Sequence, residues 1–281
     1  MPSAPGPVGP FVVKLGGSVI TRKREAERVR PKILRRLAEE VGSVAGTPVV
    51  LLHGAGSFGH PGARQFGLAR APDSDASRAR RGRGAAIVSS EVRRLHLAVM
   101  RELIRAGASP WSVPAANHAR NREGRLVHFD AAPFREALGR GLMPVSFGDV
   151  VPDEEWGWSI LSADAIAVVL AKELGARRVV FVSDVPGILG PSTTRRPAVV
   201  PEVTDAVVEG LRRVGRGPDV TGGIRGKAEA MRAIAAAGVD AGLISGLKDG
   251  ELSRALRGEF VYGSWAHARP PEDLGRDGDR P

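Results

Sequence analysis

The stretch His53-Gly-Ala-Gly-Ser-Phe-Gly-His60 follows directly on the apolar run Pro48-Val-Val-Leu-Leu52, and it decides how this sequence folds. The apolar run predicts a buried strand, and the glycines after it let backbone N–H groups approach an anion because no Cβ atom stands in the way. A phosphate group is the expected ligand. The spacing of Gly54, Gly56 and Gly59 also fits the G-x-G-x-x-G pattern of dinucleotide-binding folds, which is weak evidence when it stands alone.

A Rossmann-type NAD site is the weaker interpretation of this motif. The strand before it is the second in the chain rather than the first, and no acidic residue ends a clear strand about 20 residues further on, where a ribose partner is expected. The motif also ends on His60, which places an imidazole beside the anion and is typical of a transferase.

Lysine is scarce in this chain, since only six of its 41 basic residues are lysines. We interpret this as replacement by arginine wherever the exchange carries no cost. A compact ammonium group and a planar guanidinium group are not interchangeable at a tight phosphate site. Lys14, Lys23 and Lys227 lie beside glycine-rich or polar turns, so they are candidate phosphate ligands. Arg22 and Arg24 flank Lys23, which leaves an exposed position in a charged loop as its alternative.

The composition excludes several classes of protein. With 281 residues, 42% of them hydrophobic, the chain can form one α/β domain or two closely joined lobes. It has no cysteine, which excludes disulfides, thiolate nucleophiles and zinc bound by cysteine. The N-terminal segment lacks the charged and apolar parts of a signal peptide, and no apolar run approaches the roughly 18 residues that span a bilayer. We therefore expect a cytoplasmic protein with no membrane partner.

The net charge of +10 favours a nucleic-acid partner, because clustered cations release counterions from a polyanion. The arginines are spread over most exposed segments, however, with one local cluster at Arg78, Arg80, Arg81 and Arg83. No nucleic-acid-binding motif and only one tyrosine are present. We expect a solvated surface without bound nucleic acid, and a basic nucleic-acid-binding protein remains the alternative of another class.

The hydrophobic pattern predicts strands that alternate with helices. The expected strands are residues 11–15, 49–52, 109–113, 143–147, 178–183 and 239–244. The expected helices are residues 30–43, 85–106, 131–138, 163–174, 205–213 and 227–237, with a polar connection over 69–84 and a glycine-rich loop over 215–226. Ser162 is expected to cap the helix at 163 and Gly175 to end it. This alternation indicates an α/β fold with a mostly parallel sheet, in which ligands bind at the carboxyl ends of the strands.

Five motifs follow one another along the chain: Lys14-Leu-Gly-Gly-Ser18, His53-Gly-Ala-Gly-Ser-Phe-Gly-His60, Ser162-Ala-Asp164, Ser183-Asp-Val-Pro-Gly187 and Asp219-Val-Thr-Gly-Gly-Ile-Arg-Gly-Lys227. Over about residues 11–262 the chain resembles the amino acid kinase superfamily, and within it the isopentenyl phosphate kinases. The resemblance implies a three-layer αβα sandwich without a Walker A loop. It also implies a homodimer that uses ATP and Mg²⁺ to convert isopentenyl monophosphate, a small isoprenoid monophosphate, into isopentenyl diphosphate.

The same resemblance implies a single domain over residues 11–266, with an acceptor lobe at about 11–150 and a nucleotide lobe at about 151–266. Residues 1–10 are expected to form a disordered tail. Residues 267–281, rich in proline, glycine and charge, are expected to form a flexible one.

Each catalytic candidate takes a role from the resemblance. Lys14 would hold the transferring phosphoryl group, and Lys227 would bind the nucleotide phosphates at a helix N-terminus. Lys23 matches a lysine that stabilises the transition state, and His60 matches the histidine that hydrogen-bonds the acceptor phosphate. Asp164 would orient Lys14 and Lys227 by ion pairing. A carboxylate at a helix start is also favourable for purely structural reasons.

The binding residues implied by the resemblance are mostly small. Around the nucleotide they are Gly16, Gly17, Ser18, Gly56, Asp184, Gly187 and Gly223, together with Lys14 and Lys227. Around the acceptor they are Gly54, Ala55, Ala163 and His60. Ala55 and Ala163 replace glycines that are common in the family, so each adds a methyl group beside the acceptor. No residue is predicted as a ligand of a resident metal, and His53 is expected to be structural.

The sequence leaves more than one acceptor open. The helix at 85–107 carries an apolar stripe that could wall a hydrocarbon pocket, although such a stripe more often belongs to the core. Its members are Ile87, Val88, Val92, Leu95, Val99 and Leu103. A phosphate acceptor needs no general base, because a monophosphate with a second pKa near 6 is largely ionised at pH 7. The alternative within enzymes is a related kinase of fosfomycin or of an acyl carboxylate.

Overall fold

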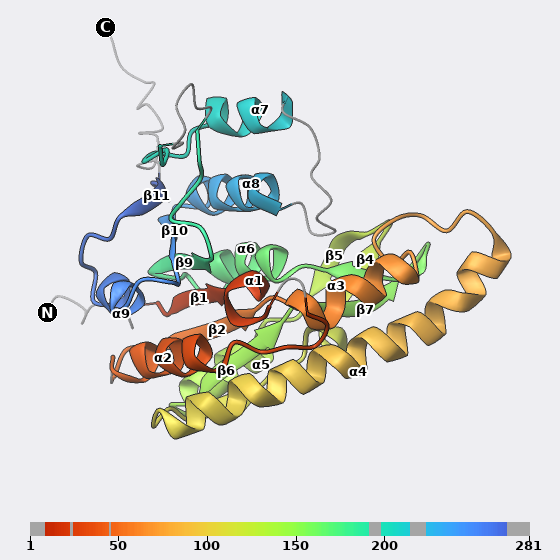
Figure 1. Cartoon of the computed structure of the whole chain (residues 1–281), viewed down its shortest axis with the longest axis horizontal. Coiled ribbons are helices and arrows are strands. Elements are labelled where there is room, and N and C mark those ends of the chain that lie inside the picture. The colour runs from red at the N-terminus through yellow and green to blue at the C-terminus, as the bar shows by residue number, and fades with distance from the viewer. Residues whose placement is uncertain (1–8, 23–24, 45, 191–197, 214–222, 269–281) are drawn as a thin grey trace, which may run out of the picture.

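The computed structural model describes residues 9–22, 25–44, 46–190, 198–213 and 223–268. Its central feature is a seven-stranded sheet with the order β11-β10-β9-β1-β2-β6-β3 (Figure 1). The strands are β1 (Phe11–Leu15), β2 (Val49–His53), β3 (Pro110–Ser112), β6 (Met143–Phe147), β9 (Arg178–Ser183), β10 (Ala241–Ser245) and β11 (Gly263–Ala266). All of them run parallel except β11, which pairs antiparallel with β10. The prediction of a mostly parallel sheet is confirmed.

Helices cover both faces of this sheet, because its central strands are apolar on both sides. One face carries α2 (Pro31–Gly42), α4 (Asp75–Arg105) and α9 (Glu251–Leu256). The other face carries α5 (Ala132–Gly139), α6 (Ala163–Glu173) and α8 (Gly223–Ala236), with α7 (Asp205–Arg213) packed on α8. The result is the predicted three-layer αβα sandwich (Figure 1).

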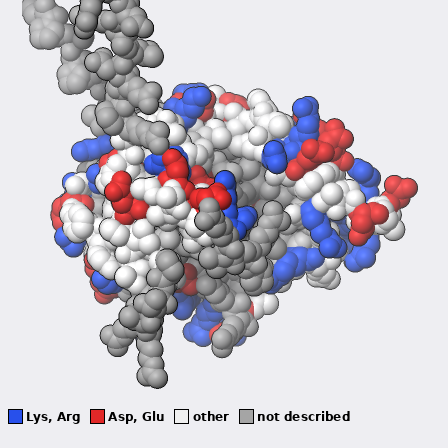
Figure 2. Space-filling view, turned by 90° about the horizontal axis from the view of Figure 1, so that it is seen from above, with Lys and Arg blue, Asp and Glu red and all other residues white. Residues whose placement is uncertain are grey.

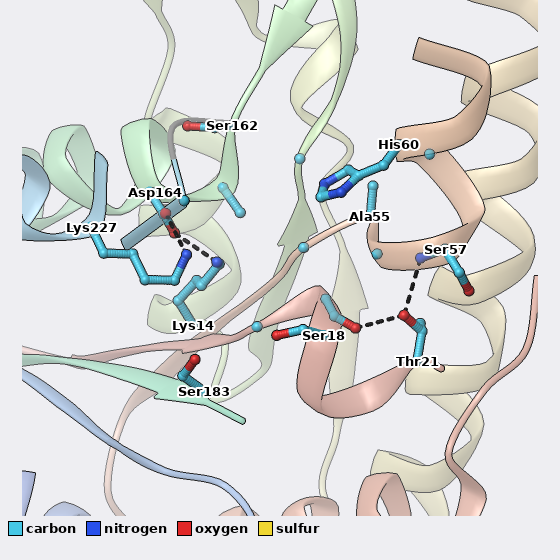
Figure 3. A pocket seen from close by; sticks show the side chains of 18 of the residues that line it. Lys14, Ser18, Thr21, Ala55, Ser57, His60, Ser162, Asp164, Ser183 and Lys227 are labelled. Carbon is cyan, nitrogen blue, oxygen red and sulfur yellow. Dashed lines mark hydrogen bonds and ion pairs between the residues drawn. The ribbon is translucent and has the colours of Figure 1, made fainter. Parts of the chain in front are cut away.

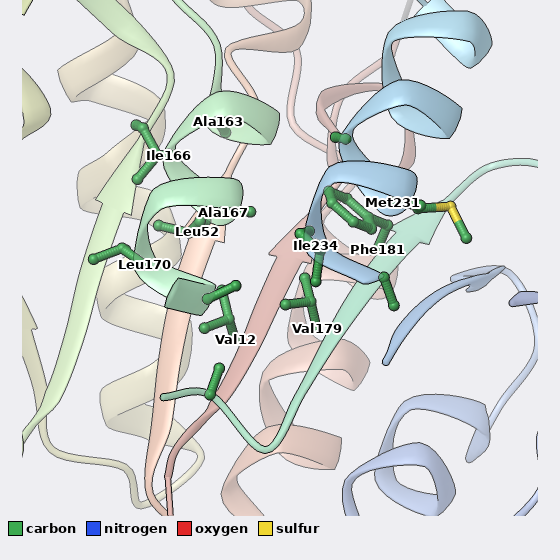
Figure 4. Close-up of a cluster of buried hydrophobic side chains, with 14 of the residues drawn as sticks. Val12, Leu52, Ala163, Ile166, Ala167, Leu170, Val179, Phe181, Met231 and Ile234 are labelled. Atoms are coloured by element: carbon green, nitrogen blue, oxygen red, sulfur yellow. The ribbon is translucent and has the colours of Figure 1, made fainter. Parts of the chain in front are cut away.

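Side chains of β1 alternate between two hydrophobic cores, as the period of a strand requires. Phe11, Val13 and Leu15 face α2 and α4, whereas Val12 faces α6 and α8. Figure 4 shows this second core, in which α6 and α8 pack on the strands. Lys14 falls on the same face as Val12, so the pleat of β1 directs its ammonium group toward α6.

Short helices begin where the parallel strands end, at the edge of the sheet where ligands are expected. Directly after β1 comes α1 (Gly17–Ile20), and α3 (Gly56–Gln65) follows β2. As predicted, Ser162 caps α6: its Oγ accepts a hydrogen bond from the Ala165 amide at 3.1 Å. Gly175, at φ +54°, lies just beyond the end of that helix.

A second, four-stranded sheet was not predicted. Its order is β5-β4-β7-β8, and its strands are β4 (Ala119–Arg122), β5 (Arg125–Phe129), β7 (Asp149–Asp153) and β8 (Gly157–Leu161). A short 3₁₀ helix, η1 (Ala115–Asn117), precedes it. The Asp153 carboxylate closes the β7–β8 turn by accepting hydrogen bonds from the amides of Glu155 and Trp156. This sheet lies beside α4 and forms one wall of the candidate site.

Two predicted helix starts are wrong. The segment 69–84 is not a polar connection throughout, because α4 begins at Asp75, where Ser74 Oγ accepts a hydrogen bond from the Ser77 amide. Likewise, α8 begins at Gly223 rather than at Lys227, so Lys227 lies one turn inside the helix. In both cases a capping residue or a glycine starts the helix before its apolar stripe begins.

The predicted tails fall largely outside the described residues. Pro10, which was assigned to the N-terminal tail, is instead buried, and its carbonyl accepts a hydrogen bond from the Arg177 amide at 2.9 Å. At the other end, the Ala268 amide donates to Asp240. In the part of the chain that the structure describes, no helix is long and apolar enough to cross a membrane.

Candidate active site

A cavity of about 590 Å³ opens at the carboxyl ends of β1, β2, β6 and β9 (Figure 3). It brings together every predicted site residue that the structure describes: Lys14, Gly16, Gly17, Ser18, Gly54, Ala55, Gly56, His60, Ala163, Asp164, Asp184, Gly187, Gly223 and Lys227. Lys23, the remaining candidate, lies outside the described residues. Segments from both halves of the chain therefore form one site.

Two lysines share one carboxylate on one side of the cavity. Lys14 Nζ lies 2.7 Å from Asp164 Oδ1, and Lys227 Nζ lies 3.2 Å from Asp164 Oδ2. The three side chains come from β1, α6 and α8, and Figure 3 shows them converging. Lys14 and Asp164 are each only 5% exposed. A buried carboxylate between two ammonium groups leaves one net positive charge, which suits an anionic ligand.

The electrostatics of this group differ between its members. Burial opposes ionisation of Asp164, but the two ammonium groups outweigh it and hold the pKa of the carboxyl at about 2. Burial lowers the pKa of Lys14 to about 8, although the Asp164 charge works in the opposite direction. Lys14 is thus charged at pH 7 yet close to its titration range.

Not every backbone amide of the loop after β1 is available to a ligand. The Gly16 amide donates to the Val182 carbonyl at 2.7 Å, so it is not available to a ligand. Gly17 and Ser18 open α1, and the first amides of a helix have no partner within it. The Ser18 hydroxyl donates to Asp184 Oδ1 at 2.6 Å, which ties this loop to the end of β9.

The two glycine-rich loops lie backbone against backbone. A Cβ atom on Gly17 would come within 2.4 Å of the Gly56 nitrogen, and one on Gly54 within 2.8 Å of the Gly17 nitrogen. Gly56 also adopts φ +52°, a conformation that favours glycine. Glycine is therefore required here so that the loops can touch, in addition to any approach of a ligand.

His60 reaches into the cavity from α3, across from the lysine pair (Figure 3). His53, as expected, is structural. It is fully buried, its Nε2 lies 3.2 Å from His96 Nδ1, and it stacks on Phe147. Burial lowers the pKa of His53 to about 3, so this ring stays neutral.

An apolar wall extends the cavity beyond His60. Val88 and Val92 of α4 and Ile160 of β8 line it, together with Ala63 of α3. The prediction that the α4 stripe forms this wall is correct only for Val88 and Val92. Leu95, Val99 and Leu103 pack in the core against the sheet, and Ile87 is 39% exposed.

Residues 9–245 match the model of the amino acid kinase family. The chain belongs to this family. It is 32% identical over 263 residues to an isopentenyl phosphate kinase of Methanothermobacter thermautotrophicus. The aligned region covers 90% of this chain and 97% of the relative. It is 35% identical over 222 residues to an isopentenyl phosphate kinase of Thermoplasma acidophilum, with coverages of 79% and 85%.

A solved structure described as isopentenyl phosphate kinase superposes with a TM-score of 0.78 at 29% identity. The match covers 91% of this chain and 99% of the other one. The sandwich architecture is thus that of the amino acid kinase family, and the NAD-binding interpretation of the glycine motif is not supported.

Some residues of this amino acid kinase site were missed. Thr21 and Arg64 both line the cavity. Arg64 lies four residues after His60 on α3, a spacing that places both side chains on one helix face. That spacing is readable from the sequence, whereas the contacts of Thr21 with the second loop are not.

Proposed function

We propose that this chain transfers the γ-phosphoryl group of ATP to isopentenyl monophosphate and forms isopentenyl diphosphate. The observation that carries the proposal is the arrangement of one cavity. Paired ammonium groups lie on one side, and an imidazole backed by an apolar wall lies on the other. Relatives that match nearly the whole chain are named isopentenyl phosphate kinases, which supports the same acceptor.

The chemical difficulty of this reaction is repulsion between two phosphates. An oxygen of the acceptor phosphate attacks the γ-phosphorus of ATP, and the bond from that phosphorus to ADP breaks. Catalysis then depends on positioning and on cations rather than on a general base. In this proposal Lys14 holds the transferring phosphoryl group and Lys227 the nucleotide phosphates, with Asp164 keeping both ammonium groups in place.

The remaining binding roles are proposed from the family resemblance, for residues that all line the cavity. The amides of Gly17 and Ser18 face the β and γ oxygens, and Asp184, Gly187 and Gly223 border the nucleotide. On the acceptor side the ligands are His60, Gly54, Ala55 and Ala163. Val88, Val92 and Ile160 receive the hydrocarbon group, which contributes binding energy by leaving water. Lys23 keeps its proposed role at the transition state.

Mg²⁺ fits this site as part of the nucleotide complex. Among the described residues, no group of three or more His, Asp or Glu side chains could hold a metal ion. Mg²⁺ commonly binds through one or two carboxylates plus substrate phosphates. Asp184 lines the cavity and is the protein carboxylate proposed for it, since Asp164 serves the two lysines. When bound, the ion neutralises charge on the phosphate oxygens.

The surface does not favour the nucleic-acid alternative. Figure 2 shows basic and acidic side chains interspersed on the face it displays, without a basic stripe. Many arginines are paired with carboxylates, for example Arg94 with Glu91 and Arg135 with Glu173.

We expect the reaction to take place in the cytoplasm, where ATP is available.

Two further features belong to this proposal. The acceptor lobe is proposed at about 11–150 and the nucleotide lobe at about 151–266, and residues of both ranges line the cavity. A homodimer is supported by exposed apolar side chains on neighbouring elements, namely Leu97 and Ile104 of α4 and Trp111 of the edge strand β3.

The decisive experiment measures ADP release from ATP in the presence of isopentenyl monophosphate, fosfomycin or an acyl carboxylate, with the product identified by phosphorus NMR. We expect turnover with the isoprenoid monophosphate to exceed that with the other acceptors. Absence of isopentenyl diphosphate would reject the proposal, and preferential turnover of fosfomycin or the carboxylate would replace its acceptor. Salt-sensitive binding of duplex or single-stranded DNA would support the nucleic-acid alternative.

A further inference from the structure

One hydroxyl group joins the two glycine-rich loops of the active site. Thr21 Oγ1 donates a hydrogen bond to the Gly17 carbonyl at 2.6 Å and accepts one from the Ser57 amide at 3.1 Å. Figure 3 draws both contacts, and Thr21 is 1% exposed. The hydroxyl therefore bridges the first turn of α1 to the first turn of α3.

The space around this hydroxyl is shaped by a glycine. A Cβ atom on Gly56 would lie 2.2 Å from Thr21 Oγ1 and 2.8 Å from the Gly17 carbonyl oxygen. Any side chain at position 56 would displace Thr21 or the loop. The bridge thus requires the hydroxyl group of Thr21 and a glycine at position 56.

The two elements joined in this way serve the two different substrates of the proposed function. The α1 turn presents the Gly17 and Ser18 amides to the nucleotide, whereas α3 carries His60 one turn after Ser57. The distance between the donor and acceptor phosphates depends on how these two turns are held against each other.

We propose that Thr21 is a positioning residue that aligns the acceptor phosphate with the γ-phosphoryl group through its two hydrogen bonds. The proposal rests on the proposed function. It predicts an effect on transfer that exceeds any effect on binding, because a displacement of about 1 Å in a reacting pair can lower a rate by about 100-fold. A misplaced acceptor also leaves room for water, so ATP hydrolysis without transfer should increase.

Thr21→Val tests this with almost no change in shape, since valine replaces the hydroxyl by a methyl group. We expect kcat for transfer to fall by about 100-fold. The KM for ATP should change little, and less isopentenyl diphosphate should form per ADP released. Thr21→Ser retains the hydroxyl and should restore that ratio. Thr204→Val is the matched control. Thr204 Oγ1 also accepts a hydrogen bond from a backbone amide, that of Val207, but Thr204 does not line the cavity.

The ratio of product to ADP separates positioning from folding. A variant that merely unfolds in part loses product and ADP release together, and its ratio stays that of the wild type. An unchanged ratio in Thr21→Val would therefore overturn the inference, as would a low ratio in Thr21→Ser. If valine prevents folding, Thr21→Cys gives the same test, because a thiol forms only weak hydrogen bonds. A wild-type chain that makes no isopentenyl diphosphate would remove the proposed function first and this inference with it.

Discussion

At the level of single residues, Asp164 determines the charge of the active site. Its carboxylate contacts both Lys14 and Lys227, and the two ammonium groups keep its pKa at about 2. Asp164 therefore stays ionised throughout the pH range in which an enzyme operates. Lys14 titrates close to that range, because burial lowers its pKa to about 8.

The first prediction is that activity falls at alkaline pH as Lys14 loses its proton. Below pH 8 the ammonium group is charged and can hold a phosphoryl group, and above pH 8 it loses its proton and this ability. The pH profile of kcat/KM, which reports groups of the free enzyme, should decline above about pH 8. The decline in kcat should lie at higher pH, since a bound phosphate favours the charged form. A kcat/KM profile that stays flat through pH 9 would contradict this role of Lys14.

The second prediction concerns His60. Replacing it by alanine should lower kcat/KM for isopentenyl monophosphate by about 100-fold, the usual cost of removing one donor to a reacting oxyanion. Nucleotide affinity, measured by calorimetry with a non-hydrolysable ATP analogue, should persist because His60 lies across the cavity from the lysines. His128→Ala, at an exposed position in β5, is the control. If nucleotide affinity falls as much as kcat/KM for isopentenyl monophosphate, His60 binds the nucleotide rather than the acceptor.

The site residues could largely be predicted because they occur in short contiguous motifs at strand ends. Lys14 and its glycines, for example, follow β1 directly, so their spacing alone places them together. Thr21 could not be found in this way. Its importance comes from a hydrogen bond to Ser57, which lies 36 residues further along the chain, and only the packing of the two loops shows it.

At the level of elements, α4 shows where sequence patterns fail. Its first ten residues are rich in arginine and suggested a solvated connection, yet Arg81 within them is 1% exposed. The Arg81 guanidinium donates to the carbonyl oxygens of Trp158 at 2.9 Å and Gly67 at 2.8 Å, and also to that of Arg70. A buried position of α4 is therefore occupied by an arginine, and a search for periodic hydrophobic residues cannot detect it.

The third prediction follows from these contacts. Arg81→Met should destabilise the protein by about 3 kcal/mol, because three partly buried carbonyl oxygens lose a charged donor. It should also increase hydrogen exchange in residues 75–84, since Arg81 joins that turn of α4 to β8. Arg80→Met removes the same charge from an exposed neighbour and serves as the control. Equal urea midpoints for the two variants would show that the buried contacts contribute nothing.

The four-stranded sheet was missed for a related reason. Its strands β4 and β5 contain arginine and histidine with few apolar residues. Part of its stability comes from polar groups, since the Asn121 side chain donates to Ser159 and Ser159 donates to Asp153. Polar residues that form such a network do not alternate with apolar ones, so the sequence pattern did not predict these strands.

At the level of the whole molecule, the order of apolar strands and helices predicted the mostly parallel sheet, and the family resemblance implied the three-layer sandwich. The central strands are buried on both faces and appear as continuous apolar runs, which sequence reasoning detects well. The edge strand β11 pairs antiparallel and contains Gly263, Ser264 and Trp265, so it gave no such signal.

The fourth prediction tests the proposed homodimer. Ile104 and Trp111 are 61% and 56% exposed, and a charged side chain at either position should weaken an apolar interface. Light scattering should show a dimer for the wild type and a monomer for the double variant Ile104→Arg, Trp111→Arg. Phe260→Arg, at an exposed aromatic position elsewhere, should remain dimeric. A monomeric wild type at micromolar concentration would reject the dimer.

The position of Lys14 within the sheet has a further consequence. It lies on β1, which is hydrogen-bonded on both sides, to β2 and to β9. Fraying of the outer strands β3 and β11 leaves this residue in place, because interior strands open only in the global transition. The backbone amide of Lys14 should therefore stay protected from hydrogen exchange on warming until the entire fold melts cooperatively.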